Sequence, residues 1–544
     1  MTQHSLPQSD QDPMTDVAGL IDMLARRAEL SGDRTAVVFG DDRLTYEALW
    51  RQVGRFAAYL ADHGVTRGDR VLLRLNNSAS FFAAYYGVQY LGAVSVPVFH
   101  GSSPERVGTI ANACLAHSVV TDAALDAGET EQIRALAHLP ELKFADLRGG
   151  VRDFDPVPCA HPRGDELAML QYTSGTTGDS KGVMLTHANL LANIRQMIPA
   201  ARFVAEDVFV SWLPVYHDMG LITMTMCPFY LGAKLVLLPV SPKPFPWFEA
   251  IRKHGGTMTA APDFGYRFAT KFSKGGDAYD LSSLKRALIA AEPVRPKTVE
   301  RFETKFGLTG VLKPGYGLAE ASVAVTFWHM DEPARKIDDE GHVSAGAPIP
   351  GMEVAIADGD RLVEPGCHGE ILMRGPSVTG GYYLNPEATE DLHFGDGWVR
   401  TGDIGYLDDA GDLYIVGRAK NIIIKAGRNL APREIEEIAE DLPGVRLSAA
   451  IGLASRDIQG EQIHLFAELD RKKPEDTYLL ELRRRLIQRV FDVLGYRPDK
   501  VHLVRNKTIP RTHNGKIQYS KLKRDFQAGV LEAESSIFQV PEGD

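Results

Sequence analysis

Short apolar runs alternate with longer amphipathic stretches through the first 330 or so residues, and this alternation predicts strands followed by helices. The clearest unit is DRVLLRL, SASFFAAYYGVQYLG and AVSVPV, which lie close together within 69–98. A strand, helix and strand in this order pair as parallel strands with a right-handed crossover. The alternation continues through KLVLLPV, TMTAAPDF and LKRALIAAE. We therefore expect an α/β fold with layered, mostly parallel sheets and helices covering them.

The pattern changes after about residue 335, where short strands are broken by Gly, Pro and Asp. The segment EVAIADGDRLVEPGCHGEILMRGPSVTGGYY is typical of a small β-rich subdomain, which we place at about 336–417. Further on, the strands AAIGLA and IHLFAEL and a helical stretch at 479–494 predict a small α+β domain. The predicted organisation is an N-terminal domain at 1–417, a joint at 418–421 and a C-terminal domain at 422–544.

Composition agrees with a large globular protein. At 544 residues the chain is too long for one ordinary hydrophobic core, which favours two or three domains. Its 44% hydrophobic and 24% charged residues argue against a disordered or fibrous protein. The formal net charge of −11 argues against a nucleic-acid binder or a protein of acidic membrane surfaces. We therefore expect no nucleic-acid partner.

Cysteine usage and hydropathy indicate the compartment. The four cysteines lie far apart and form no CxxC pair, which fits a reducing cytoplasm and neither a zinc site nor a disulfide framework. The first residues are polar, and no signal peptide is visible. The longest apolar run, at 224–239, is interrupted by Gly232 and Lys234 and is too short to span a bilayer. We expect a cytoplasmic protein without membrane insertion.

The segment YTSGTTGDSKGVMLTHANL contains the most unusual loop of the chain, at 173–182. Successive small residues allow backbone N–H groups to face one concavity, and hydroxyls, Lys181 and a following helix add to an anion site, most naturally for phosphates. A Walker A loop requires GxxxxGK[ST], whereas Lys181 follows Ser180 and precedes Gly182, so a P-loop NTPase is excluded. The alternative interpretation is a flexible surface loop.

The loop resembles the phosphate-binding signature of the adenylate-forming superfamily, which includes acyl-CoA synthetases, nonribosomal peptide adenylation domains and luciferase-like enzymes. Further motifs resemble those of the superfamily in the same order: GYGLAEA (315–321), RTGDIGYLDDAGDLYIVGRAKNIIIKAGRN (400–429) and PRTHNGKIQ (510–518). The resemblance covers about 15–525. Within the superfamily, SWLPVYHDMGLI and AAEPVRPKTVERF are most similar to fatty acyl-AMP ligases.

This resemblance implies ATP and Mg²⁺ as cofactors. It implies that Tyr316 packs on adenine, that Asp403 accepts from both ribose hydroxyls and that Glu320 holds the metal ion. A core tyrosine, a turn aspartate and a surface glutamate are the alternative interpretations. The family usually has Thr before this glutamate, and Ala319 replaces it here. The complete ATP-binding set implied is Thr173, Ser174, Gly175, Thr176, Thr177, Gly178, Lys181, Ala291, Glu292, Pro293, Tyr316, Gly317, Asp403 and Arg418.

The reaction implied brings a carboxylate to the α-phosphate of ATP, and a cation must offset the repulsion between the two anions. By resemblance Lys516 is that catalytic cation, although charge alone fits a solvated lysine in a basic segment. His217 is expected near the acyl carboxylate, with a structural histidine as the alternative. Lys420 matches the hinge about which the C-terminal domain rotates between the two half-reactions. This rotation would withdraw Lys516 and bring 425–430 into the site.

The predicted function is ATP-dependent activation of a fatty or other lipophilic carboxylic acid as its adenylate, with release of pyrophosphate and transfer to a thiol. Fatty acyl-AMP ligases typically carry an insertion after the GYGLAEA motif, and the segment WHMDEPARKIDDEGHV is too short for it. The acceptor therefore stays open between an acyl carrier protein, coenzyme A and a second enzyme. A full acyl-CoA synthetase, a nucleotide-binding regulatory homologue without turnover and a luciferase-type oxidase are the alternatives, although the intact loop, Glu320 and Lys516 argue against the regulatory protein.

Overall fold

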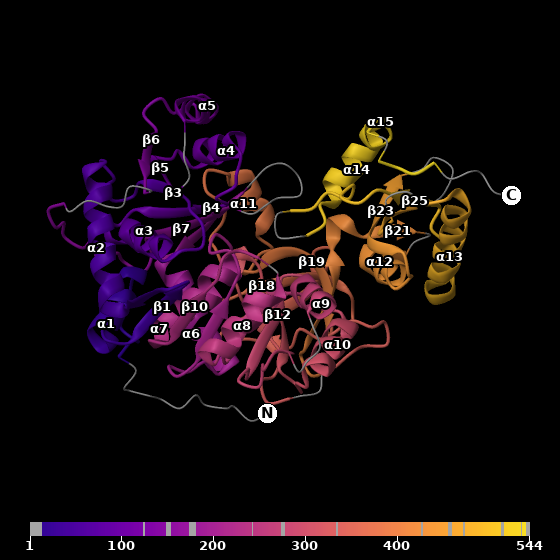
Figure 1. Ribbon diagram of the computed structural model, residues 1–544, viewed down its shortest axis with the longest axis horizontal. Coiled ribbons are helices and arrows are strands. Elements are labelled where there is room, and N and C mark those ends of the chain that lie inside the picture. The colour runs from indigo at the N-terminus through magenta and orange to yellow at the C-terminus, as the bar shows by residue number, and fades with distance from the viewer. Residues whose placement is uncertain are drawn as a thin grey trace.

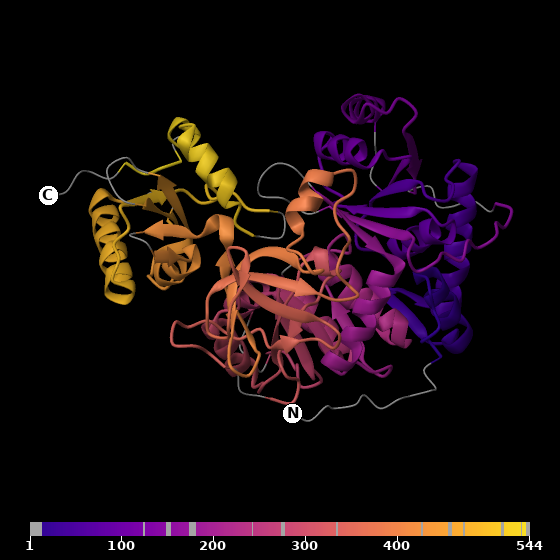
Figure 2. The ribbon, with the colours of Figure 1, turned by 180° about the vertical axis from the view of Figure 1, so that it is seen from behind.

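The computed structural model shows a large body, formed by the elements up to β20, and a smaller unit that runs from β21 to α15 (Figures 1 and 2). It describes residues 13–122, 126–147, 154–172, 181–241, 243–273, 278–332, 336–425, 428–454, 460–471, 474–512, 516–534 and 536–539.

The first sheet of the body has six strands in the order β6-β5-β3-β4-β7-β8. Its strands are β3 (Arg70–Arg74), β4 (Val94–Val98), β5 (Ser118–Thr121), β6 (Lys143–Asp146), β7 (Leu167–Tyr172) and β8 (Gly182–Thr186). Its helices are α2 (Tyr46–Asp62), α3 (Ala79–Tyr90), α4 (Pro104–Cys114) and α5 (Ala127–Ala137). All pairs are parallel except β7–β8. The strand–helix–strand unit expected within 69–98 is confirmed, since β3 and β4 pair in parallel across α3.

The second sheet has nine strands in the order β15-β14-β13-β12-β11-β9-β10-β1-β2, and its six central strands are parallel. Its strands are β1 (Thr35–Phe39), β2 (Asp42–Thr45), β9 (Val208–Ser211), β10 (Lys234–Leu237), β11 (Met258–Pro262), β12 (Arg286–Ala290), β13 (Leu312–Tyr316), β14 (Thr326–Phe327) and β15 (Ala347–Pro348). Its helices are α1 (Leu20–Ser31), α6 (His187–Ala201), α7 (Cys227–Leu231), α8 (Pro244–His254), α9 (Asp263–Phe272) and α10 (Pro296–Phe306). One hydrophobic core connects this sheet with the first, and the expected α/β class is confirmed.

A five-stranded antiparallel sheet follows, in the order β17-β16-β18-β19-β20. Its elements are β16 (Glu353–Asp358), β17 (Arg361–Leu362), β18 (Gly369–Arg374), α11 (Pro386–Leu392), β19 (Val399–Leu407) and β20 (Leu413–Arg418). The 3₁₀ turn η4 (Ala419–Asn421) then leads directly into the smaller unit. The joint expected at 418–421 thus coincides with the end of β20 and this turn.

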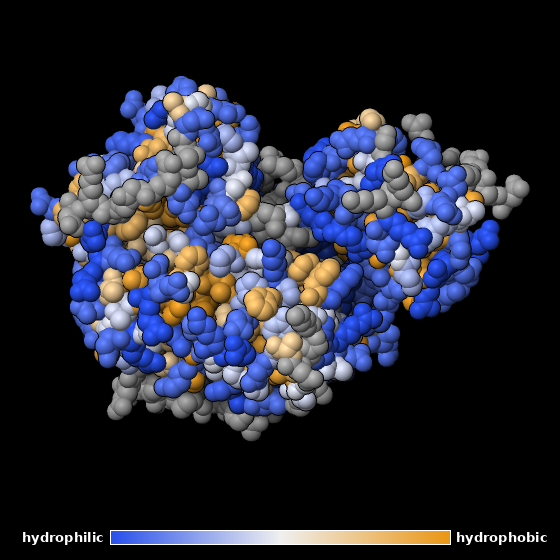
Figure 3. Space-filling model, in the orientation of Figure 1, coloured by the Kyte–Doolittle hydropathy of each residue, from blue (hydrophilic) through white to orange (hydrophobic). Residues whose placement is uncertain are grey.

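The C-terminal unit has hydrophobic clusters of its own, separate from the core of the body. It contains the hairpin β21 (Ile423–Lys425) and β22 (Arg428–Leu430), the sheet β23 (Val445–Ala454), β24 (Glu461–Leu469) and β25 (Lys500–Val504), and the helices α12 (Pro432–Glu440), α13 (Asp476–Leu494), α14 (Tyr519–Gln527) and α15 (Val530–Ala533). A separate core lets such a unit keep its structure while its orientation changes. On the face seen in Figure 3, hydrophilic side chains predominate on both parts. Among the described helices, each is too short or too polar to cross a bilayer.

Candidate active site

Four neighbouring strands of the nine-stranded sheet bring the predicted site residues together. The strands β13, β12, β11 and β9 are adjacent and run parallel, so their carboxyl ends meet at one edge. This edge carries Tyr316, then the segment 291–293, then Asp263, and then the segment 212–218 that follows β9. Ligands of open α/β sheets bind at such an edge.

Asp403 is held from two sides. The Tyr316 hydroxyl donates to Asp403 Oδ2 at 2.7 Å, and Arg418 Nε lies 2.8 Å from Asp403 Oδ1. Asp403 and Arg418 are opposite each other in the β19–β20 ladder, which fixes their spacing. Burial raises the pKa of Asp403, while the Arg418 charge and the Tyr316 hydrogen bond lower it. The carboxylate is therefore oriented before any ligand arrives.

Gly317 follows Tyr316 where two backbone segments nearly touch. A Cβ at this position would lie 1.7 Å from the carbonyl oxygen of Val323. The requirement for glycine is therefore steric, and it keeps the GYGLAEA turn against the residues that return to β14.

Glu320 and Lys181 both contact Tyr382, a residue that the sequence analysis missed. The Tyr382 hydroxyl donates to Glu320 Oε1 at 2.8 Å, and Lys181 Nζ lies 4.9 Å from the centre of the Tyr382 ring. The Thr379 backbone N–H donates to the Glu320 carbonyl at 2.7 Å. No local pattern marks Tyr382, because its role depends on a hydrogen bond to a residue 62 positions away. Tyr382 orients the carboxylate proposed for Mg²⁺ beside the lysine of the phosphate loop.

The segment 291–293 has a strained backbone at the end of β12. Ala291 has a φ of +67°, a conformation that costs a residue with a Cβ and is often found at functional sites. Glu292 Oε1 is shielded from solvent and has no hydrogen-bond partner among the described residues. Burial and the nearby Asp263 raise the pKa of Glu292, while Arg267, Lys516 and Arg433 lower it. An unpaired acceptor therefore lies beside Ala291 and Pro293, at the predicted adenine position.

Lys516 comes from the C-terminal unit, and its charge acts on three carboxyl groups of the body. It lowers the pKa values of Asp218, Glu292 and Asp403, each of which burial raises. The Lys516 backbone is held locally, since its carbonyl accepts from Thr512 N–H at 2.8 Å and its N–H donates to Thr512 Oγ1 at 3.2 Å. The orientation of the two parts therefore brings this ammonium within electrostatic reach of the candidate nucleotide site.

His217 and Asp218 directly precede the π-helix η1 (Met219–Met226), which sequence periodicity did not reveal. Asp218 Oδ1 accepts from Met219 N–H at 2.7 Å, and burial together with the Glu320 charge raises the pKa of Asp218. Gln171 Nε2 donates to the Tyr216 carbonyl at 3.0 Å and so ties this segment to the end of β7. π-helical turns are rare and are often found at functional sites. Asp218, within the YHDMG segment, is thus a candidate site residue that the sequence analysis did not predict.

Lys420 lies in η4 and is within electrostatic reach of the same site. Partial desolvation lowers the pKa of Lys420, the charges of Arg418 and Lys181 act in the same direction, and Asp403 opposes them. The hinge position is therefore beside the nucleotide residues in this orientation of the C-terminal unit.

The structure thus brings together most of the positions proposed from the sequence at one edge of the large sheet. Six phosphate-loop positions lie outside the described residues: Thr173, Ser174, Gly175, Thr176, Thr177 and Gly178. Lys181, which follows these positions, is described and lies 4.9 Å from the centre of the Tyr382 ring, and the phosphate role of the loop stays a prediction.

Comparison with known proteins identifies the class. The AMP-binding enzyme family matches residues 24–383, so this chain belongs to that family. It is 30% identical over 572 aligned residues to the medium-chain-fatty-acid–[acyl-carrier-protein] ligase JamA of Moorena producens (strain JHB), covering 94% of this chain and 96% of the relative. It is 30% identical over 534 residues to a long-chain-fatty-acid–CoA ligase of Bacillus subtilis (strain 168), covering 90% and 91%.

Comparison with solved structures gives the same class of enzyme. A structure from work on fatty acyl-adenylate ligases of E. coli and L. pneumophila is similar with a TM-score of 0.84 and 28% identity, covering 95% of this chain and 99% of that one. The chain is a ligase of the fatty acyl-AMP ligase branch of the adenylate-forming enzymes, as the motifs predicted. The two relatives named above are ligases of a fatty acid with an acyl carrier protein and with coenzyme A.

Proposed function

We propose that this protein uses ATP and Mg²⁺ to activate a medium or long fatty acid, or a similar lipophilic acid, and passes the acyl group to the thiol of an acyl carrier protein or of coenzyme A. The observation that carries the proposal is the position of Lys516, whose charge acts on Glu292 and Asp403 from a separate unit. A cytoplasmic location belongs to the proposal, and the four free cysteines support it.

The chemistry explains why a mobile cation is needed. A carboxylate oxygen attacks the α-phosphorus, the bond from that phosphorus to the bridging oxygen breaks, and the electron pair leaves with pyrophosphate. At about 4 Å and an effective dielectric near 20, the repulsion between the two anions is about 4 kcal/mol. Lys516 between carboxylate and α-phosphate offsets this repulsion most strongly in the transition state, where the anions are closest.

Different residues of the body bind the ribose, the adenine and the phosphates of ATP in this proposal. In the proposal Asp403 accepts from the ribose hydroxyls while Arg418 and Tyr316 keep it oriented. Tyr316 and the segment 291–293 hold adenine, and Lys181 and the loop before it hold the terminal phosphates. His217 lies at the entrance for the acyl carboxylate.

Glu320 fits a role as magnesium ligand. Mg²⁺ binds one or two carboxylates together with phosphate oxygens, and Glu320 is partly exposed with one oxygen fixed by Tyr382. When bound, the ion would neutralise charge on the leaving pyrophosphate. Lys181, which lies over the Tyr382 ring, adds a second positive charge near the same group.

For the second half-reaction we propose rotation about Lys420, which would withdraw Lys516 and expose the adenylate to a thiol. The segment 328–343 occupies the position of the insertion that is typical of fatty acyl-AMP ligases and is too short to contain it. Ile337 and Val343 form an antiparallel bridge there, and the Tyr406 hydroxyl donates to Asp338 at 2.7 Å. This short segment supports a domain that can rotate, so coenzyme A stays a candidate acceptor beside the carrier protein.

The test is acid-dependent pyrophosphate exchange over a panel of short, medium and long fatty acids, followed by identification of the product with coenzyme A and with a holo acyl carrier protein. We expect exchange with a lipophilic acid and a thioester with one acceptor. The absence of exchange with every carboxylic acid would contradict the proposed function. Rapid acyl-CoA formation by the purified enzyme would exclude a strict carrier-protein ligase.

A further inference from the structure

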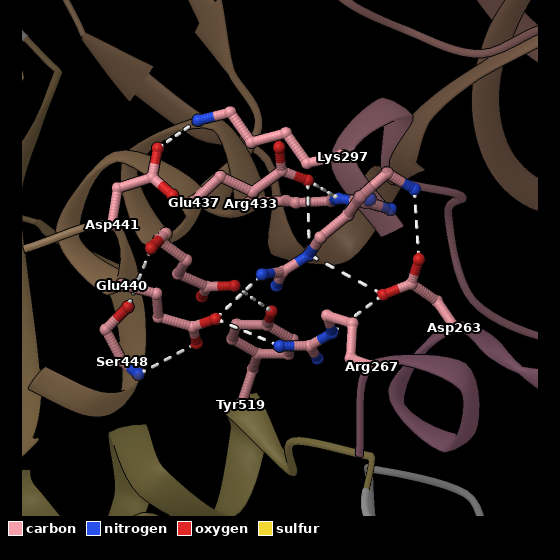
Figure 4. A network of polar contacts seen from close by, with 11 residues as sticks. Asp263, Arg267, Lys297, Arg433, Glu437, Glu440, Asp441, Ser448 and Tyr519 are labelled. Carbon is pink, nitrogen blue, oxygen red and sulfur yellow. Dashed lines mark hydrogen bonds and ion pairs between the residues drawn. The ribbon is translucent and has the colours of Figure 1, made fainter. Parts of the chain in front are cut away.

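Arg295, in the AAEPVR segment, has no part in the reaction described above, yet it lies at the contact between the two parts of the protein. Arg295 Nη1 lies 2.7 Å from Glu440 Oε2, and its Nε lies 3.3 Å from Glu437 Oε1. Both glutamates belong to α12 of the C-terminal unit, whereas Arg295 precedes α10 of the body. Figure 4 shows this contact as part of a larger group of charged side chains.

The same arginine is anchored within the body. Its backbone N–H donates to Asp263 Oδ1 at 3.0 Å, and its Nε lies 3.8 Å from Asp263 Oδ2. Arg267 Nε donates to Asp263 Oδ2 at 2.8 Å, and Arg267 Nη1 reaches Glu440 Oε2 at 3.2 Å. Two arginines of the body therefore converge on one carboxylate oxygen of the C-terminal unit (Figure 4).

Glu440 is itself fixed on its own side of the contact. Its Oε1 accepts from the Ser448 backbone N–H at 3.1 Å, so the two oxygens face different parts of the protein. The side chains are mostly shielded: Asp263 is 1% exposed, Glu440 10% and Arg295 16%. Shielded charge pairs are screened little by salt, and removing one partner leaves the other charge uncompensated.

We propose that Arg295 is a positioning residue, which with Arg267 holds Glu440 and thereby keeps the C-terminal unit in the orientation that presents Lys516 to the site. The inference rests on the proposed function, because it assigns Arg295 to the adenylation half of that reaction. Its consequence is that loosening this contact slows adenylation and does not slow transfer of an already activated acyl group.

The Arg295–Glu440 contact is also connected to the proposed nucleotide pocket along the polypeptide chain. Arg295 follows Pro293 by two residues, so the segment proposed to bind adenine continues directly into the residue that binds α12. Arg267 and Asp263, which hold Arg295, also act on the pKa of Glu292. Nucleotide binding at 291–293 and docking of the C-terminal unit therefore share one short segment.

A second ion pair across the same interface provides a matched control. Lys297 pairs with Asp441, but the two side chains are 59% and 34% exposed. Exposed pairs of this kind contribute little to a contact. Lys297→Ala thus removes a positive charge from the same interface without removing the shielded contact.

The experiment compares Arg295→Ala, Arg295→Lys, Glu440→Gln and the double variant Arg295→Ala/Glu440→Gln with Lys297→Ala and the native enzyme. We measure pyrophosphate exchange, ATP binding by calorimetry, transfer from synthetic acyl adenylate to a pantetheine thiol, and the radius of gyration by small-angle X-ray scattering. For Arg295→Ala and Glu440→Gln we expect exchange to fall at least about tenfold, since each removes one member of a shielded group of ion pairs and leaves the remaining charges only partly compensated. ATP affinity should stay within about threefold, acyl transfer should be unchanged or faster, and the radius of gyration should increase.

The double variant should exchange pyrophosphate no more slowly than the slower of the two single variants, because both substitutions disrupt the same Arg295–Glu440 contact. Arg295→Lys should recover part of the exchange rate, since it keeps the charge but not the planar guanidinium. Lys297→Ala should behave like the native enzyme. An unchanged exchange rate and radius in Arg295→Ala would overturn the inference, and so would losses that multiply in the double variant. If Arg295→Ala fails to fold, the isosteric Glu440→Gln carries the same test.

Failure of this inference is distinguishable from failure of the proposed function. If the native enzyme exchanges pyrophosphate with no acid, the proposed function is contradicted, and the scattering comparison still tests the contact. If the native enzyme is active and the Arg295 and Glu440 variants match it in every measurement, only the positioning role is lost.

Discussion

The Tyr316 hydroxyl and the Asp403 carboxylate are joined by a 2.7 Å hydrogen bond between the end of β13 and the middle of β19. These strands belong to different sheets, the large parallel one and the antiparallel one of the subdomain. The proposed nucleoside site therefore lies where the two sheets meet. A substitution on either side of this bond should affect ATP binding before it affects the fold.

Asp403→Asn should weaken ATP binding. An asparagine offers one acceptor oxygen, cannot balance the Arg418 charge and places an NH₂ group where an acceptor is needed. A hydrogen bond to a charged group contributes about 1.5–3 kcal/mol, so we expect the KM for ATP to rise at least about tenfold. Steady-state pyrophosphate exchange at varied ATP measures this, with the fully exposed Asp360→Asn as control. Unchanged ATP affinity would contradict the ribose role.

Lys516→Ala should abolish most adenylation while leaving ATP binding intact. The ammonium offsets a repulsion of about 4 kcal/mol, which corresponds to about a thousandfold in rate. Calorimetry with ATP and exchange assays separate the two effects. The matched control is Lys521→Ala on α14, whose lysine pairs with Asp525 on the same helix. A normal exchange rate in Lys516→Ala, or an equal loss in Lys521→Ala, would contradict a specific catalytic role.

Much of the fold could be predicted from the sequence because parallel strands and their helices leave local signals. The unit β3–α3–β4 shows both apolar runs and helical periodicity, and each signal is a property of a short segment. Tyr316, Asp403 and Lys516 could be predicted as site residues because each stands in a motif that resembles a motif of the adenylate-forming superfamily.

Contacts between distant segments left no such signal. Tyr382 is an ordinary tyrosine in the sequence, and its role depends on a hydrogen bond to Glu320, 62 positions away. Arg295 and Glu440 are 145 positions apart, and either could be a surface charge. The π-helix after Asp218 was also missed, because an apolar stretch buried on all sides has no periodicity that separates helix types.

Gly317→Ala should destabilise the protein severely. The added Cβ would lie 1.7 Å from the Val323 carbonyl oxygen, and a backbone atom cannot move aside as the end of a side chain can. We expect a loss of more than about 4 kcal/mol in the free energy of unfolding, measured with urea. Gly54→Ala is the control, because Gly54 lies within α2 with no heavy atom within 4 Å of its added Cβ. There alanine should stabilise by about 0.5–1 kcal/mol. Equal stability of the two variants would refute the steric argument.

Glu436 should make the C-terminal unit less stable as the pH rises towards neutral. Burial raises the pKa of Glu436 from 4.5 to about 7, although it accepts hydrogen bonds from Ala450 N–H and the Tyr519 hydroxyl. Between these pH values the folded state keeps a proton that the unfolded state has released. The contribution of Glu436 to the free energy of unfolding is therefore fully present below pH 4.5 and is lost as the pH rises through 7, by up to about 3 kcal/mol. Glu436→Gln keeps one oxygen that accepts from Ala450 N–H, places an NH₂ group that can donate to the Tyr519 hydroxyl oxygen, and cannot ionise. Its free energy of unfolding should therefore change less between pH 5 and 8 than that of the native protein, and the two urea series should converge at the acidic end. Parallel curves for the two proteins across this range would show that Glu436 does not titrate there.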